Sequence, residues 1–214
     1  TFYLLGSDYI WPRTSMKIAR KHIENVLGGK VVGEEYYPLG NTQFGSLINK
    51  IKLRKPDAVF AAVVGGSNVA FYKQMKAAGV TADKQTLLTL SVTEDELLGI
   101  GGENMAGFYA SMKYFQSLDN ENNKKFVEAW KAYAKAKNLP NYQTAVTNDP
   151  MEATYVGIHM WAQAVEKAGT TDVDKVREAM AGQTFAAPSG FTLKMDEKNH
   201  HLHKSVFIGE VKAD

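Results

Sequence analysis

The stretch LLGSDYIWP, residues 4–12, decides how the start of this chain folds. It continues the apolar pair Phe2-Tyr3 and predicts a buried strand, which Gly6-Ser7 interrupts before Pro12 allows a helix to begin. The interruption therefore falls at the carboxyl end of a strand, directly before a helix. In open α/β sheets this is the place where ligands bind.

Four side chains of this stretch could contact a ligand: Ser7, Asp8, Tyr9 and Trp11. Two rings beside a hydroxyl and a carboxylate suit a small polar molecule that stacks on the rings and forms a few hydrogen bonds. The rings could equally pack the loop against the domain without touching a ligand. These residues alone leave both interpretations open.

The composition is that of an ordinary globular protein, with 44% hydrophobic residues, 22% charged residues and a formal net charge of +2. The lysines and arginines are scattered, which argues against nucleic acid as a partner. The chain has no cysteine, which excludes disulfides and thiolate zinc sites. No apolar run approaches the roughly 18 residues of a membrane span. Because the chain opens with Thr1 in a strand, we expect a further part upstream.

Strand and helix patterns alternate through the first hundred residues. Short apolar runs predict four strands, at residues 2–5, 30–37, 58–64 and 87–92. A helical pattern follows each strand, beginning near residues 13, 44, 67 and 93. Four such strand–helix units predict an α/β fold with a doubly wound parallel sheet.

The second half has a different pattern, with predicted helices at 124–136, 149–168 and 172–181. The second of these has a strong start, in which Asp149 is the cap and Glu152 reaches back to it. Residues 191–195 and 205–211 predict a hairpin. The helical block has too few strands for a sheet of its own, so we expect it to pack against something outside this chain. Segment boundaries are predicted near 115–120 and 184–190.

Helical spacing also predicts which side chains these helices bury. The expected apolar faces are Ile18, Ile23, Val26 and Leu27; Phe44, Leu47, Ile48 and Ile51; Phe126, Val127, Trp130 and Tyr133; Met151, Tyr155, Ile158, Ala162 and Val165; and Val173, Val176 and Met180.

Two further loops follow predicted strands. Gly65-Gly66-Ser67-Asn68 could let backbone amides approach a ligand at a helix start, although an ordinary tight turn would explain the same residues. It matches neither GxGxxG nor GxxxxGK[ST], so a nucleotide phosphate is poorly supported. Ser91 and Thr93 lie at the next strand end.

Catalytic and metal motifs are weak. The cluster NHHLH, residues 199–203, flanks a turn, and we interpret its histidines as solvated rather than metal-binding. GxSxG and HExxH are absent from the sequence. Glu94, Asp95 and Glu96 are explained by their place at a helix start. We therefore predict a protein that is not an enzyme and uses no cofactor and no metal.

Five motifs together carry a family resemblance: GSDYIWPR (6–13), GEEYYPLG (33–40), SNVAFYKQ (67–74), DPMEA (149–153) and AGQTF (181–185). With them the chain resembles, from end to end, the type I periplasmic solute-binding proteins of bacterial ABC transporters. Within that group it looks like the urea and short-chain amide branch.

The resemblance implies two α/β lobes that are joined by three crossovers and close on a ligand. Residues 1–115 would form the α/β sheet of the carboxyl lobe, 118–185 helices of the amino lobe, and 190–214 a hairpin returning to the carboxyl lobe. The strands of the amino lobe would then lie upstream of Thr1. Half of the binding cleft would be missing from this sequence.

The resemblance also implies ligand contacts. Tyr9 matches the aromatic residue that touches the ligand, with Trp11 nearby, and further contacts would come from Val64-Gly65-Gly66 and from Ser91 and Thr93. Asp8 belongs to the motif and could brace the loop. Amino-acid-binding relatives need a carboxylate from this lobe, which residues 65–68 do not offer. That favours a neutral ligand such as urea, although Gly66 stands where the urea proteins commonly have an acidic residue.

The function expected from the resemblance is capture of a small neutral amide, with urea first, in the periplasm or at the exterior of the cell envelope. The partner would be an ABC-transporter permease, and contact with the membrane would occur only through it. Two alternatives stay open: an amide-sensing regulatory protein of the same fold, and a binding protein for branched-chain amino acids.

Overall fold

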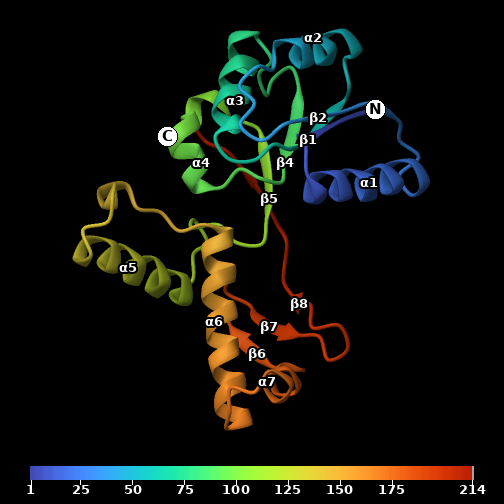
Figure 1. The fold of residues 1–214 in the computed structure, drawn as a ribbon. Helices are drawn as coiled ribbons and strands as arrows, with labels where there is room; N and C mark the ends of the chain where they lie inside the picture. Colours follow the sequence, from blue (N-terminus) through green and yellow to red (C-terminus); the bar gives the residue numbers. More distant parts are fainter. Residues whose placement is uncertain (214) are drawn as a thin grey trace. The chain divides into compact units, whose positions relative to one another are not determined.

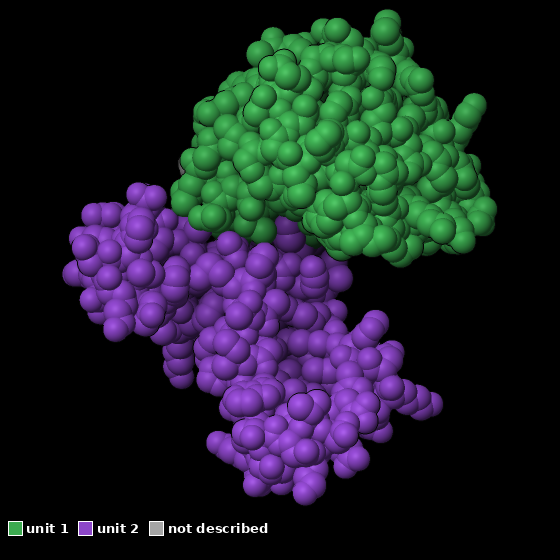
Figure 2. Space-filling model, viewed as in Figure 1, with its two compact units in different colours: residues 1–111, 208–214 green, residues 112–207 purple. Residues whose placement is uncertain are grey.

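The computed structural model describes residues 1–213, which divide into two compact units (Figure 2). Unit 1 comprises residues 1–111 together with the carboxyl-terminal segment from residue 208, and unit 2 comprises residues 112–207. No helix of the described residues is long and apolar enough to cross a membrane.

Unit 1 is built on a six-stranded sheet with the strand order β2-β1-β3-β4-β5-β9 (Figure 1). The neighbouring pairs among its first five strands are parallel, as the sequence predicts for a doubly wound α/β fold. The elements are β1 (Phe2–Ser7), α1 (Ile10–Asn25), β2 (Val31–Tyr37), α2 (Gly45–Arg54), β3 (Ala58–Ala62), α3 (Ser67–Ala77), β4 (Thr86–Thr89), α4 (Glu94–Ile100), the 3-10 turn η1 (Gly102–Asn104), β5 (Tyr109–Met112) and β9 (Phe207–Glu210).

Helices cover both faces of this sheet. Tyr3 and Leu5 of β1 belong to a large core cluster with α2 and α3, whereas Leu4, which points to the other face, packs with Met16 and Ile23 of α1. The alternation along β1 is that of a strand buried on both sides. The predicted face of α2 is confirmed, since Phe44, Leu47, Ile48 and Ile51 are all buried.

Helix α1 differs from the prediction. It begins at Ile10, so that Pro12 lies within its first turn, and its buried residues are Pro12, Met16 and Ile23. The predicted core residues Ile18, Val26 and Leu27 are each at least 60% exposed. Val26 and Leu27 lie beyond the end of α1 at Asn25, and the side of the helix that packs on the sheet is the one that carries Met16 and Ile23.

Unit 2 holds the remaining elements: α5 (Glu121–Ala136), the 3-10 turn η2 (Tyr142–Thr144), α6 (Asp149–Ala168), α7 (Val173–Met180), β6 (Thr184–Ala186), β7 (Thr192–Met195) and β8 (Leu202–His203). Its three strands form a small antiparallel sheet in the order β6-β7-β8. Because β7 pairs with β6 and β8 while β9 joins the other sheet, the hairpin predicted between 191–195 and 205–211 does not form.

The buried face of α6 is also displaced from the prediction. Val156, Met160 and Ala164 are buried at intervals of four residues, and they pack with α7 and with the small sheet. The predicted residues Tyr155 and Ile158 are instead 37% and 61% exposed. This helix carries apolar side chains on two sides, and only one of them is covered within unit 2.

The start of α6 contains buried charges rather than the predicted capping box. Asn148 is the cap, since its side chain accepts a hydrogen bond from the Met151 N–H at 3.0 Å. The fully buried Glu152 instead accepts a hydrogen bond from the Lys204 ammonium. Asp149 lies 3.1 Å from the Lys113 ammonium and 3.9 Å from that of Lys204.

Candidate functional site

Three loops lie side by side at one edge of the sheet in unit 1. They follow β1, β3 and β4, which are parallel neighbours, so their carboxyl ends meet at the same edge. We call these loops, residues 7–11, 64–68 and 91–93, the rim. All the residues that the sequence analysis proposed as ligand contacts lie on it, at the position where open α/β sheets bind ligands.

The first rim loop presents the two rings. Tyr9 precedes the first residue of α1, and Trp11, in its first turn, is 40% exposed. Their ring centroids lie 6.4 Å apart with the planes inclined by 32°. A Cβ on Gly6 would come within 2.7 Å of the Pro12 Cβ, so glycine is needed for α1 to start this close to the strand.

Asp8 is held by a charged partner. Its carboxylate accepts a hydrogen bond from the Arg13 Nε at 2.6 Å, and the Arg13 guanidinium lies 4.4 Å from the centre of the Tyr36 ring. The guanidinium of Arg13 lowers the pKa of Asp8 below its ordinary value. These contacts give Asp8 the geometry of a brace between the loop and α1. The sequence pattern alone did not single out Arg13, although it places an opposite charge five residues after Asp8 within the same motif.

The second loop leaves backbone donors unused. Its Val64 N–H donates to the Ser7 hydroxyl at 3.1 Å, and Gly65 has a φ of +63°, which favours glycine. Helix α3 starts without a side-chain cap, and the N–H groups of Gly65, Gly66 and Ser67 donate to no other described residue. Free amides at a helix start favour a carbonyl or an anionic oxygen of a ligand.

The hydroxyls of the third loop are engaged within the fold. Ser91 donates to the Val63 carbonyl at 2.5 Å, and its own carbonyl lies 3.4 Å from the Asn68 side-chain nitrogen. Thr93 is buried and forms a capping box with Glu96 at the start of α4. These contacts connect the second and third loops, a role for Asn68 that the sequence analysis did not assign.

Two of the three histidines in residues 199–203 have a protein partner for the ring. The His203 Nε2 lies 3.1 Å from an oxygen of Asp196, and the His200 Nε2 lies 3.1 Å from the Arg177 carbonyl. Backbone N–H groups of Asn199 and Lys198 lower the pKa of Asp196 to about 2. Within residues 1–213 no three histidine or acidic residues are grouped so that they could hold a metal ion.

Comparison with known proteins places the chain in a class. The family described as periplasmic binding protein domain matches residues 1–214, so the chain belongs to it. That family consists of solute-binding proteins, and its fold agrees with the doubly wound sheet of unit 1.

The individual relatives differ in the ligands that their names or structures give. The Leu/Ile/Val-binding protein homolog 6 of Brucella melitensis is 29% identical over 97% of this chain and 52% of its own length. A solute-binding protein of an ABC transporter from Rhodopseudomonas palustris, solved with bound 3,4-dihydroxybenzoic acid, is 26% identical with a TM-score of 0.83, over 98% of this chain and 55% of that one. The chain thus spans about half the length of these relatives.

One relative has the name of an enzyme. A protein of Geobacillus stearothermophilus named limonene hydroxylase is 36% identical over 117 residues, which are 54% of this chain but 20% of that protein. The match is partial in both chains, and the name describes that protein.

Proposed function

We propose that this protein is a non-enzymatic, extracytoplasmic solute-binding protein that captures a small neutral amide, with urea as the first candidate. It would deliver this ligand to the permease of an ABC transporter from the periplasm or the exterior of the cell envelope. Two observations support this function: the family to which the chain belongs and the chemistry of the rim residues.

The observation that carries the choice of a neutral ligand is the pair formed by Asp8 and Arg13. These opposite charges lie 2.6 Å apart and compensate each other, so the first loop offers neither a free carboxylate for an ammonium nor a free cation for a carboxylate. Glu96 is engaged with Thr93 at the start of α4. What the rim offers is therefore mostly neutral: two rings and the backbone of the second loop.

Those neutral groups suit a planar amide. The free N–H groups of Gly65, Gly66 and Ser67 would donate to its carbonyl oxygen, while the Tyr9 and Trp11 rings would contact its flat face. Val64 belongs to the same loop as these amides. Ser91 and Thr93 would hold the neighbouring third loop in place through their contacts within the fold. Urea has one carbonyl and no charge, so it satisfies these donors without burying an ion.

We also propose that unit 1 supplies one jaw of a two-jawed cleft. Residues 118–185 would belong to the amino lobe, and the rest of that lobe would come from a part of the protein outside this sequence, in line with relatives about twice as long. Contacts of one ligand with both jaws would then favour the closed state.

A second candidate is an amino acid, because several relatives are named for leucine, isoleucine and valine. Its ammonium would need a carboxylate on the rim, and Glu94, in the first turn of α4, is the acidic residue that follows Thr93 directly. An amide sensor with a regulatory partner would use the same rim as a urea transporter. Only the partner protein separates those two roles.

Calorimetric titration of the full-length protein with urea, acetamide, formamide and leucine tests the proposal. We expect binding of urea or a short amide and no binding of leucine. Glu94→Gln should leave amide binding unchanged, whereas it should abolish leucine binding if the ligand is an amino acid. Tight leucine binding with no heat from urea would exclude the neutral-amide function.

Tyr9→Ala should weaken binding of the amide by more than tenfold, about 1.4 kcal/mol, because it removes the ring that contacts the ligand. The matched control is Tyr133→Ala, which removes an exposed ring from α5 in unit 2 and should leave affinity unchanged. Equal affinities for the wild type and Tyr9→Ala would show that this ring only packs the loop.

A further inference from the structure

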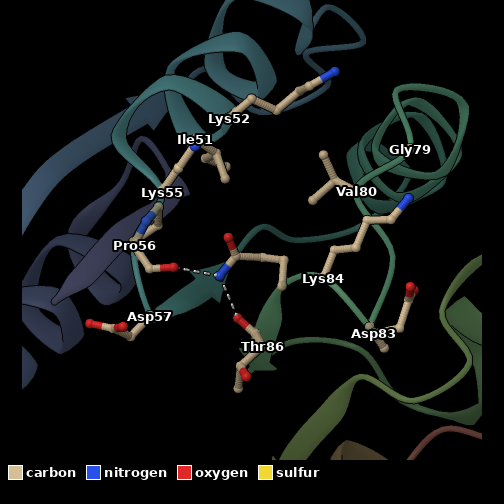
Figure 3. A pocket seen from close by; sticks show the side chains of 12 residues that line it. Ile51, Lys52, Lys55, Pro56, Asp57, Gly79, Val80, Asp83, Lys84 and Thr86 are labelled. Carbon is tan, nitrogen blue, oxygen red and sulfur yellow. Dashed lines mark hydrogen bonds between the residues drawn. The ribbon is translucent and has the colours of Figure 1, made fainter.

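A hollow opens at the edge of the unit 1 sheet opposite the rim. It lies where β3 and β4 begin, between the end of α2 and the loop that follows α3, and has a volume of about 580 Å³ (Figure 3). That volume lies within the range of small-molecule sites. The residues that matter here are the buried Ile51, Pro56, Val80 and Gln85, and the exposed Lys55 and Lys84.

Gln85 gives this hollow a polar group with a fixed direction. The residue is 8% exposed, and its Nε2 donates to the Pro56 carbonyl at 3.0 Å and to the Thr86 carbonyl at 3.1 Å, the two bonds drawn in Figure 3. Because both partners are carbonyls, the atom facing them must be the nitrogen. The Oε1 of Gln85 has no hydrogen-bond partner among the described residues and lines the hollow. An acceptor that faces the hollow and has no protein donor is available to a donor group of a ligand.

The walls and the mouth differ in character. Ile51, Pro56 and Val80 supply apolar walls, whereas the mouth is charged. Its lysines stand beside two aspartates, Asp57, which pairs with the Thr1 ammonium, and Asp83. The Lys52 ammonium already donates to the Ala78 carbonyl at 3.0 Å. Lys55 and Lys84 form no salt bridge with a described residue, so they are the two cations available to a ligand.

We propose that this hollow is a second binding site, for a small organic carboxylate that also carries a hydroxyl or N–H donor on an apolar body. The donor would bond to the Gln85 Oε1, the apolar body would cover Ile51 and Val80, and the carboxylate would lie between Lys55 and Lys84. Lysines at the end of α2 also compensate the helix dipole, but that role does not explain the unpartnered oxygen of Gln85.

The probe is para-hydroxyphenylacetate, with phenylacetate as the matched compound that lacks the donor. Both are titrated into the isotope-labelled full-length protein, and amide resonances are followed by NMR. We expect saturable shifts of Val80, Thr86 and the Gln85 side-chain amide, at lower concentration for the hydroxylated compound. Equal affinity for both compounds, or no shift at these residues, would overturn the proposal.

Variants at the mouth test the charge component without disturbing the core. Lys55→Gln and Lys84→Gln should each weaken binding of para-hydroxyphenylacetate by about threefold, the size of an exposed ion pair. The matched control, Lys73→Gln, removes an exposed lysine of α3 outside the hollow and should change nothing. Unchanged affinity in both mouth variants would exclude a carboxylate between these lysines.

The readout separates this site from the rim. Tyr9→Ala should leave the shifts at Val80 and Thr86 unchanged even if it abolishes amide binding. Shifts confined to Gly65 and Gly66 would show that the probe binds only the rim, which would refute the second site and leave the first one standing.

Discussion

The two units differ in the size of their hydrophobic cores. In unit 1 one large core cluster runs from β1 through α2 and α3 to Phe108 and Val211. Unit 2 has only two small core clusters, on α6 and α7, among its described residues. Charged groups are buried where its longest helix begins. A chain segment that has long helices but so small a hydrophobic core is typical of part of a larger domain.

The largest expected effect concerns the core of unit 1. Phe71→Ala should lower the free energy of unfolding by about 3–5 kcal/mol, because the ring packs at 5.3 Å from Phe44 and 4.9 Å from Tyr72 and its loss leaves a cavity. Guanidinium unfolding measures this loss without adding urea, the proposed ligand. Tyr133→Ala, at an exposed ring of unit 2, is the control and should cost less than about 0.5 kcal/mol. Equal losses of unfolding free energy in the two variants would contradict the difference in core size between the units.

The buried charges of unit 2 should give the next largest effect. Lys204→Met removes the cation beside Glu152 and leaves a buried carboxylate without compensation, which should cost about 3 kcal/mol in guanidinium unfolding. Adding Glu152→Leu to this variant should restore most of the lost stability, because the pair is then replaced by apolar groups. A double variant no more stable than Lys204→Met would mean that the lysine acts through Asp149 instead.

The exposed side of α6 tests whether unit 2 is part of a larger lobe. In the full-length protein Ile158→Ala should cost about 2 kcal/mol or more if this side is covered by the rest of the amino lobe. The comparison is Val156→Ala, which removes a side chain already buried in unit 2. A cost below about 0.5 kcal/mol for Ile158→Ala beside a clear cost for Val156→Ala would refute the domain assignment.

The smallest effect is a pH dependence at Glu152. Burial raises its pKa above the ordinary value of 4.5, although Lys204 opposes the change. Between pH 4.5 and the native pKa, the native carboxyl therefore keeps a proton that the unfolded state has released. The stabilisation from this proton is complete below pH 4.5 and is lost as the pH rises through the native pKa. Relative to Glu152→Gln, the wild type should lose stability over this interval in guanidinium unfolding. A gain instead would show that the ion pair with Lys204 outweighs burial.

The sequence predicted best those features that depend on neighbouring residues along the chain. The face of α2 and the acidic helix start after Thr93 follow from local spacing and chemistry, and both are confirmed. In α1 and α6 more than one apolar stripe competes, and the stripe that becomes buried depends on the surface opposite, which spacing alone does not define. The partners of β7 likewise depend on contacts distant in sequence.

For the candidate site, the sequence predicted the three loops because each is a strand end before a helix. It did not predict how their side chains pair. The Asp8–Arg13 pair and the Asn68–Ser91 contact join residues through the fold. The unpartnered oxygen of Gln85 could not be seen either, since it follows from two carbonyls that only the folded chain brings to the same amide.

Gly6 limits how this rim can change over evolution. Its absent side chain leaves room for Pro12, and the neighbouring Ala62 carbonyl lies only 3.3 Å from where a Cβ would stand. Any larger residue at this position would push the helix away and move both rings of the first loop with it. New ligand preferences in descendants of this protein should therefore arise by exchanging the side chains at positions 9 and 11, while the backbone that carries them stays in place.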